Sequence, residues 1–275
     1  MSARKTNRMG VIMAGGSGER FWPMSRRLRP KQLLCLTSPG QTLLAEAVAR
    51  LEPIVPPENV YIVTGRHLVN PIREANTGLP RENVIAEPCK RNTSGALAYA
   101  AAFLLARLGV PPEHITMVVT TADHEIGSPE RFQQAVAATL ELVEREDVLA
   151  TLGVVPTRPE TGYGYIQIDE DSPSLSKGSV AIYPVTAFHE KPNREKAEDF
   201  VASGRYFWNS GMFCFKAGVF LDELNTHAPE IYQACVSAYQ QSQKGDFLRI
   251  PLEAMQAIPE DSIDYAVMEH SGRVR

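Results

Sequence analysis

The stretch MGVIMAGGSGERFWPMSRRLRPKQ, residues 9–32, joins a short apolar run to a glycine-rich loop. The apolar run, residues 9–14, has the character of a strand buried on both faces of a parallel sheet. Gly15, Gly16 and Gly18 follow at once, and glycine allows a tight turn in which backbone N–H groups approach a ligand closely. Consecutive free N–H groups after a strand form a concave nest that suits phosphate.

Two cationic side chains accompany this loop, Arg20 and Lys31. Arginine is suited to bidentate contact with phosphate. No Gly-Lys-Ser/Thr ending follows Gly18, which excludes a P-loop, and Phe21 stands where a dinucleotide fingerprint needs its third glycine. The stretch therefore predicts a site that holds a polyphosphate, and a strand-to-helix turn without a ligand is the alternative.

The segment AGGSGERFWPMSRRLRPKQ resembles the signature of the sugar-1-phosphate nucleotidyltransferases. Within that family it is most similar to the mannose-1-phosphate guanylyltransferases, because residues 22–26 (WPMSR) and 30–32 (PKQ) favour that branch. Further matches extend the resemblance from Met9 to about His270. The resemblance implies an enzyme that transfers GMP from GTP to α-D-mannose 1-phosphate, forming GDP-mannose and pyrophosphate.

Composition sets broad limits on the class of protein. The chain has 275 residues, a hydrophobic content of 44% and a net charge of -4, so no broad basic surface for nucleic acid is expected. No apolar run approaches the ~20 residues that span a bilayer. The four cysteines form no C-x-x-C pair, which argues against a zinc site and fits free thiols in a reducing cytoplasm. Residues 1–8 are predicted to form a flexible tail and residues 9–275 a catalytic domain.

Short apolar segments alternate with helical patterns in the first half of the chain. The predicted strands are residues 9–14, 59–64, 84–86 and 115–120, and the predicted helices are residues 41–55, 93–108 and 129–146. This alternation predicts an α/β fold with a doubly wound, mostly parallel (mixed) Rossmann-like sheet of the nucleotidyltransferase type. Ligands bind beyond the carboxyl ends of the strands in such sheets, where the glycine loop and Asp123 both lie.

The second half of the chain is richer in strand patterns. The predicted strands are residues 149–155, 163–169, 179–188 and 211–215, and a helix is predicted over residues 193–203. Residues 156–192 are predicted to form a β-rich insertion that covers the sugar side of the ligand-binding cleft.

Asp123 directly follows a predicted strand, in TTADHE. A carboxylate at this place can hold Mg²⁺ against phosphate oxygens, and a helix N-cap is the alternative. In the resembled family this aspartate is a metal ligand, and a second one comes from a later W-x-D-V-G segment. This chain reaches Arg275 before such a segment, so the resemblance predicts a domain that lacks its usual C-terminal part. Asp264 belongs to a separate SIDY match and is not assigned the second metal role.

Glu87 lies in AEPCKRNTSGALA, which resembles the EP-x-x-x-NTA segment that contacts the nucleobase in the family. Guanine presents N1–H and N2–H₂ on one edge, and a carboxylate can accept from both, whereas adenine offers no such pair. Glu87 is therefore predicted to select GTP, with a solvated loop carboxylate as the alternative. Asn92 and Thr93 are predicted to face the nucleotide and to cap the following helix.

Three further motifs resemble the sugar-phosphate site of the family. They are GYGY with Gly164, FHEKP with Glu190 and Lys191, and WNSGMF with Asn209. Glu190 and Asn209 would bind sugar hydroxyls, and Lys191 would pair with the phosphate. The side chains of Glu190 and Lys191 should diverge if the backbone is extended. The alternative for Gly164 is a glycine of a hairpin or bulge. The alternative for Glu190 and Lys191 is a surface ion pair.

The implied reaction needs no general base, because the attacking phosphate is already an anion. Catalysis should come from positioning and charge neutralisation, with Arg20 and Lys31 on the departing pyrophosphate and Lys191 on the nucleophile. Three alternatives stay open: a nucleotidyltransferase for another NTP or sugar, a non-catalytic nucleotide-sugar-binding protein and, least favoured, a nicotinamide-dependent oxidoreductase. A homodimer is compatible with the sequence, which does not define the oligomeric state.

Overall fold

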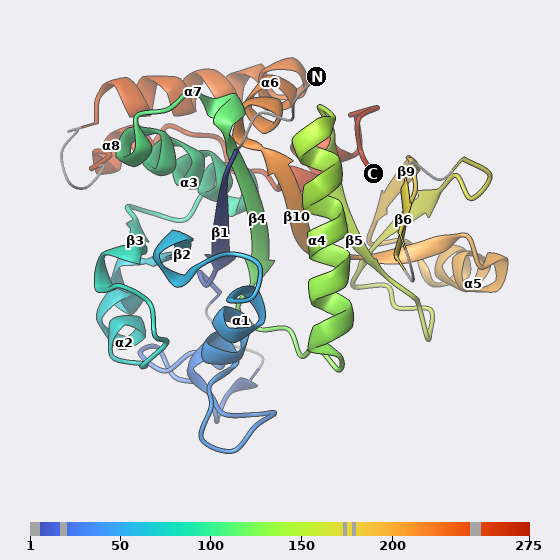
Figure 1. The fold of residues 1–275 in the computed structure, drawn as a ribbon, viewed down its shortest axis with the longest axis horizontal. Coiled ribbons are helices and arrows are strands. Elements are labelled where there is room, and N and C mark those ends of the chain that lie inside the picture. The colour runs from blue at the N-terminus through green and yellow to red at the C-terminus, as the bar shows by residue number, and fades with distance from the viewer. Residues whose placement is uncertain (1–5, 17–20, 173–174, 178–179, 243–248) are drawn as a thin grey trace.

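The computed structural model describes residues 6–16, 21–172, 175–177, 180–242 and 249–275 (Figure 1). Within these ranges the strands form an eight-stranded sheet in the order β3-β2-β1-β4-β10-β6-β9, and β5 also pairs with β10. The strands are β1 (Asn7–Met13), β2 (Val60–Gly65), β3 (Val84–Glu87), β4 (Ile115–Thr121), β5 (Leu149–Val154), β6 (Gly164–Ile168), β9 (Val185–Glu190) and β10 (Tyr206–Lys216). A separate hairpin consists of β7 (Leu175–Lys177) and β8 (Val180–Ile182).

The N-terminal half of the sheet is parallel. β1 pairs in parallel with β2 and β4, and β2 pairs in parallel with β3. β10 then runs antiparallel to β4, β5 and β6. The prediction of a mostly parallel, mixed α/β sheet is confirmed, and the carboxyl ends of β1, β3 and β4 meet at one edge.

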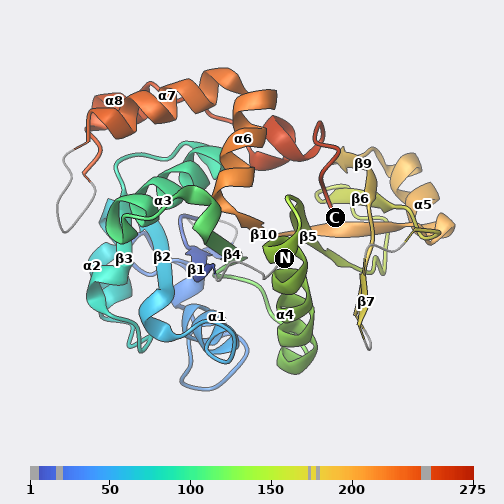
Figure 2. The same cartoon turned by 45° about the horizontal axis from the view of Figure 1, so that its top comes forward.

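Helices cover both faces of this sheet (Figures 1 and 2). They are α1 (Leu43–Leu51), α2 (Val69–Arg73), α3 (Asn92–Leu108), α4 (Pro129–Arg145), α5 (Arg194–Ser203), α6 (Ala217–His227), α7 (Pro229–Gln240) and α8 (Leu252–Gln256). Helices α1, α2 and α4 share one buried cluster, and α3, α6, α7 and α8 share the other. Val11 of β1 points into the second cluster and Ile12 into the first, as the alternation of a doubly buried strand requires.

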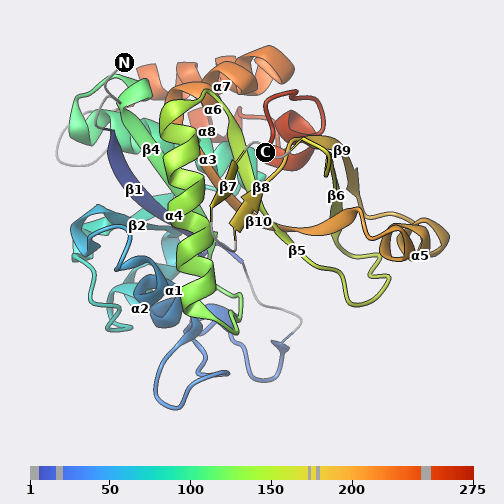
Figure 3. The ribbon, with the colours of Figure 1, turned by 45° about the vertical axis from the view of Figure 1, so that its right-hand side comes forward.

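The β-rich half stands to one side of the parallel half, where α5 packs beside β6 and β9 (Figure 3). β10 begins at Tyr206, five residues before the predicted strand 211–215, because its first part pairs with β6 and its last part with β4. The predicted strand 179–188 is instead two strands, β8 and β9. Pro184 lies between them, and proline has no N–H to donate to a sheet ladder.

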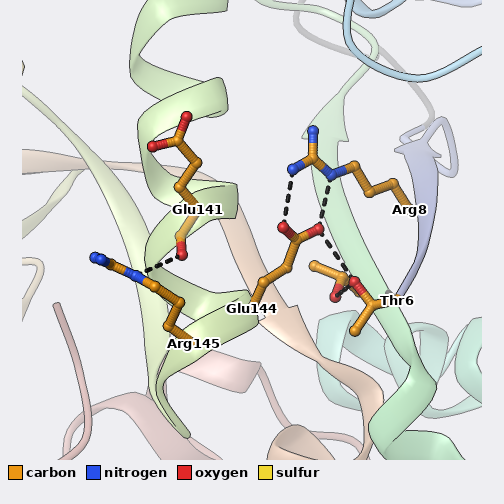
Figure 4. A network of polar contacts seen from close by, with 6 residues as sticks. Thr6, Arg8, Glu141, Glu144 and Arg145 are labelled. Carbon is orange, nitrogen blue, oxygen red and sulfur yellow. Dashed lines mark hydrogen bonds and ion pairs between the residues drawn. The ribbon is translucent and has the colours of Figure 1, made fainter. Parts of the chain in front are cut away.

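The start of β1 is fixed to α4 by a polar network (Figure 4). Arg8 makes a bidentate ion pair with Glu144, with Nε 2.7 Å from Oε1 and Nη2 2.8 Å from Oε2. The hydroxyl of Thr6 donates to the same Oε1 at 3.1 Å. The predicted flexible tail is therefore wrong for residues 6–8, and residues 1–5 lie outside the described ranges.

None of the helices in the described ranges combines the length and the apolar character that crossing a bilayer requires.

Candidate active site

A pocket lies at the carboxyl ends of β1, β3 and β4, which is where the sequence placed the ligand. Its lining comes from the glycine loop, the end of β3, the start of α3 and the end of β4. The lining residues are Met13, Ala14, Gly15, Gly16, Gln32, Glu87, Lys90, Asn92, Thr93, Ala96, Thr121, Ala122 and Asp123. Of the predicted phosphate-binding residues, Gly18 and Arg20 lie outside the described ranges.

The glycine loop is held from behind by Gln32, which the sequence analysis did not assign to the site. Its buried side-chain amide donates to the carbonyls of Ala14 at 2.8 Å and Gly16 at 3.4 Å. The hydroxyl of Thr64 also donates to the Ala14 carbonyl, at 3.0 Å. The described start of the loop, residues 14–16, is therefore held by side chains of the protein, including the glutamine that ends the PKQ motif.

Lys31 and Asp123 are brought together from positions 92 residues apart. The Lys31 ammonium lies 3.4 Å from Asp123 Oδ2 and 4.6 Å from the centroid of the Phe21 ring. The side chains are 24% and 47% exposed, respectively, and an ion pair this exposed contributes at most about 1 kcal/mol to stability. The pair therefore adds little to stability. Asp123 lines the pocket, and Lys31 lies beside it without lining the pocket itself.

Asp123 is a suitable oxygen donor for a hard divalent cation. Within the described ranges, no group of three or more His, Cys, Asp or Glu side chains could hold a metal by itself. Mg²⁺ normally keeps several waters and shares one or two protein carboxylates with substrate phosphates. The residues present therefore fit a cation held jointly by Asp123 and a bound nucleotide.

The ring of His124, the residue after Asp123, interacts with other side chains of the protein. Its ring Nδ1 is within hydrogen-bond reach of the Thr121 hydroxyl and lies 3.7 Å from Asp123 Oδ1. Burial lowers the pKa of His124, and the nearby Asp123 carboxylate only partly offsets that effect. This environment favours the neutral ring, in agreement with a structural role.

Glu87 is buried at the end of β3, with 6% of its surface exposed. The alternative of a solvated loop carboxylate is therefore wrong. Its Oε1 has no hydrogen-bond partner among the described residues, and a Cβ on Gly15 would come within 3.7 Å of its Oε2. Burial raises the pKa of Glu87 to about 7, although Lys90 acts in the opposite direction. The buried Oε1 beside the glycine loop is thus able to accept a hydrogen bond from an N–H group of a ligand.

Asn92 and Thr93 begin α3 at the pocket wall. Asn92 has a φ of 55°, and its Oδ1 accepts from the Thr93 N–H at 2.9 Å. The Thr93 hydroxyl accepts from the backbone N–H of Ile263 at 2.9 Å. Asn92 thus satisfies one free N–H of the helix, whereas Thr93 holds a distant segment instead of capping the helix.

The predicted sugar-phosphate residues come together between β6, β9 and β10. Gly164 pairs with Glu190 across the strands, and a Cβ on Gly164 would lie 2.5 Å from Glu190 Oε2 and 3.5 Å from the Cβ of Asn209. Backbone and carboxylate can approach this closely only because residue 164 has no side chain. Gly164 begins β6 and pairs with Glu190 in the ladder, so it is not the turn residue of a hairpin.

Glu190 and Lys191 do not diverge, contrary to the prediction. Lys191 has a φ of 48°, so the backbone leaves the extended conformation at this residue. Its Nζ consequently lies 2.5 Å from Glu190 Oε1, and this hydrogen bond raises the pKa of Lys191. Glu190 is largely covered, with a side chain 14% exposed, while Lys191 reaches solvent at 59%.

Asn209 has a fixed orientation because its neighbours use most of its hydrogen-bonding capacity. Its Oδ1 accepts from the Thr151 hydroxyl at 3.0 Å and from the Gly211 N–H at 3.2 Å. Its Nδ2 donates to Asp264 Oδ1 at 2.8 Å, which leaves one N–H for a ligand.

Asp264 joins this cluster through Asn209, although the sequence analysis assigned it no role beyond the SIDY match. Burial, with a contribution from Glu190, raises its pKa to about 6. It begins a π-helical turn, Asp264–Met268, and such turns are frequent at functional sites. No local sequence signal could have placed it beside Asn209, because the contact joins elements 55 residues apart.

Comparison with known families agrees with this architecture. Residues 9–250 match the model of the family described as nucleotidyl transferase. The Escherichia coli K12 protein named mannose-1-phosphate guanylyltransferase is 42% identical over 265 residues, which cover 95% of this chain and 54% of that relative. The Pseudomonas aeruginosa alginate biosynthesis protein AlgA is 39% identical over 266 residues, 96% of this chain and 53% of the relative. The chain thus spans about half the length of these curated relatives.

Solved structures give the same result for the fold. A Thermus thermophilus structure named mannose-1-phosphate geranyltransferase has a TM-score of 0.82 and 34% identity, covering 98% of this chain and 73% of its own. A Helicobacter pylori structure named mannose-6-phosphate isomerase has a TM-score of 0.77 and 29% identity, covering 98% and 95%. With a family model matched along most of its length, the chain belongs to the nucleotidyl transferase family.

Proposed function

We propose that this chain transfers GMP from GTP to α-D-mannose 1-phosphate, forming GDP-mannose and pyrophosphate. The observation that carries the proposal is the buried, unpartnered carboxyl of Glu87 beside the glycine loop. Guanine is the base whose edge offers two adjacent N–H donors to such a group. The names of the curated relatives support the same sugar and base.

The proposed roles combine the family resemblance with the positions of the described charged residues. Lys191 pairs with the sugar phosphate after exchanging its contact with Glu190, and Glu190 and Asn209 bind sugar hydroxyls. Lys31, together with Arg20, stabilises the departing pyrophosphate. When Mg²⁺ is bound through Asp123, it supplies further neutralisation of phosphate charge. Gly15, Gly16 and Gly18 form the nest for the phosphates, and Asn92 and Thr93 line the nucleotide side.

The proposed function is tested by measuring pyrophosphate release from the purified chain with Mg²⁺, mannose 1-phosphate and one NTP at a time. Release with GTP well above that with ATP, UTP, CTP or dTTP is expected. Glucose 1-phosphate in place of mannose 1-phosphate tests the sugar. Equal release with another NTP or sugar would identify a different member of the family, and GTP binding without release would indicate a non-catalytic binding protein.

Glu87→Gln tests the choice of base through its pH dependence. The pKa of Glu87 is about 7 in the folded protein and 4.5 in the ordinary, unfolded state. Between these two values the folded state binds more protons than the unfolded state, so the free energy of unfolding of the protein should fall as the pH rises. GTP affinity should rise over the upper part of this range, because the ionised carboxylate accepts both guanine N–H groups. Glu87→Gln should flatten both profiles and weaken the preference for GTP over ATP.

Calorimetric titration of each protein with GTP and ATP from pH 5.5 to 8.5 provides the measurement. The GTP phosphates also titrate, but they do so equally for both proteins, so the difference between the profiles belongs to Glu87. An unchanged GTP/ATP preference in Glu87→Gln would contradict the role of this residue in base selection.

The proposed location is the cytoplasm. Cys35, Cys89, Cys214 and Cys235 are all free thiols, as a reducing compartment would keep them.

A further inference from the structure

Arg91 fastens the start of α3 to a segment far along the chain. Its Nε donates to the Met255 carbonyl at 3.0 Å and its Nη2 to the Gln256 carbonyl at 2.7 Å. Its Nη1 pairs with Glu260 Oε1 at 2.9 Å. These three bonds use all three nitrogens of the guanidinium, in a planar arrangement of donors that lysine lacks. The Arg91 side chain is only 18% exposed, whereas that of Glu260 is 57% exposed.

The next residues of α3 continue the same attachment. Buried Ser94 donates its backbone N–H at 3.3 Å and its hydroxyl at 2.5 Å to the carbonyl of Asp261. The Thr93 hydroxyl accepts from the Ile263 N–H. Gly95 makes room for this arrangement, because a Cβ there would lie 2.6 Å from the Cβ of Arg91. The first turn of α3 therefore fixes residues 255–263 at several successive points.

The fixed segment leads directly to Asp264. Asp264 opens the π-helical turn, with the Glu269 N–H donating to its carbonyl at 3.0 Å. Its side chain accepts from Asn209, whose own carbonyl oxygen is held by Thr151 and Gly211. The attachment that begins at Arg91 thus ends on the side chain that orients Asn209, a residue of the predicted sugar-phosphate site.

We propose that Arg91 is a positioning residue that couples the nucleotide side of the cleft to the sugar-phosphate side. It fixes residues 255–263 against α3, and this fixes Asp264 and, through it, the amide of Asn209. Arg91 is adjacent in sequence to Lys90 and Asn92, which line the nucleotide pocket, although it does not line that pocket itself. The inference rests on the proposed function, since it assigns Asn209 to the sugar phosphate.

Three variants separate the parts of this attachment. Arg91→Met removes the three bonds to residues 255–260. Arg91→Lys keeps the positive charge but replaces the planar set of guanidinium donors by a single ammonium. Glu260→Gln is the matched control, because it removes only the exposed ion pair and leaves both bonds to main-chain carbonyls. Arg194→Met, which removes an exposed ion pair with Glu198 on α5, controls for the loss of an arginine elsewhere.

Hydrogen exchange at single amides provides a measurement that does not depend on activity. The Ile263 and Ser94 amides are expected to exchange at least about tenfold faster in Arg91→Met than in the parent protein, while amides of β1 keep their rates. Glu260→Gln should leave all of these rates unchanged. Parent-like exchange at Ile263 and Ser94 in Arg91→Met would overturn the attachment, whatever the enzyme catalyses.

Binding measurements test whether this attachment positions the sugar-phosphate side. In Arg91→Met the Kd for mannose 1-phosphate is expected to rise about tenfold and the Kd for GTP by less than about threefold, with Arg91→Lys in between. In an Asp264→Asn background the same substitution should add little, because both act through one side chain. Equal losses for both ligands, or additive losses in the double variant, would overturn the proposal. A parent protein that binds no mannose 1-phosphate would refute the proposed function, while the exchange result would still stand.

Discussion

Replacing Asp123 by asparagine is expected to lower kcat for pyrophosphate release by about 10³-fold, the effect of roughly 4 kcal/mol of lost charge stabilisation. Asparagine keeps the size of the side chain but presents only one oxygen and no charge to a cation. Stability should change little, because the ion pair of Asp123 with Lys31 is long, at 3.4 Å, and accessible. Steady-state kinetics over a range of Mg²⁺ concentrations, with a melting curve for each protein, provides the measurement.

Asp199→Asn, on the exposed surface of α5, is the matched control for this substitution. It should retain the parent kcat and the parent dependence on Mg²⁺. If Asp123→Asn also kept the parent kcat and Mg²⁺ dependence, Asp123 would be no more than a partner of Lys31, and the proposed cation site would be wrong.

Lys31→Met is expected to lower kcat by about 10²–10³-fold while the KM for mannose 1-phosphate stays within about threefold of the parent value. Methionine retains much of the apolar stem and removes the ammonium, together with its contact to the face of the Phe21 ring. The large effect on kcat is expected because the charge on pyrophosphate grows as the bond to the α-phosphate breaks. Single-turnover measurements with saturating GTP separate this effect from product release.

Lys196→Met on α5 removes an exposed ammonium away from the pocket and serves as the control. A purely structural Lys31–Asp123 pair would give small and equal effects in Lys31→Met and Asp123→Asn, and both proteins would respond to Mg²⁺ like the parent. An unaltered kcat in Lys31→Met would refute the role of this residue on the leaving group.

The parallel half of the sheet, with strands β1 to β4, was predictable because the sequence patterns that indicate its strands and helices are local. The strands there are short apolar runs and the predicted helices have their own periodicity. Gly109 directly follows the predicted helix 93–108 and ends α3 with a φ of 62°. The order of strand, loop and helix then places Lys31, Glu87 and Asp123 at one edge without any knowledge of tertiary contacts.

The remaining features depend on contacts between distant segments. The start of β10 was missed although Tyr206, Phe207 and Trp208 favour a strand. Asn209 and Gly211 interrupt that pattern, and β10 continues past them through a register shift between Asn209 and Phe213. The predicted direction of the Lys191 side chain, away from that of Glu190, was wrong because the φ of Lys191 lies in the left-handed region. Asp264 and Arg91 contact residues 55 and about 165 positions away, and sequence spacing alone gives no indication of such contacts.

The position of β10 in the sheet has a consequence for the synthesis of the protein. β4 lies in the middle of the sheet, yet its antiparallel neighbour is made much later in the chain. At typical synthesis rates of about 5–20 residues per second, roughly 5–20 s pass between the emergence of β4 and that of the end of β10. During that time the half-made sheet presents an unpaired strand edge, which is a template for pairing with another chain. Neighbouring nascent chains on one messenger would carry the same open edge, so this interval is when the protein is most exposed to self-association.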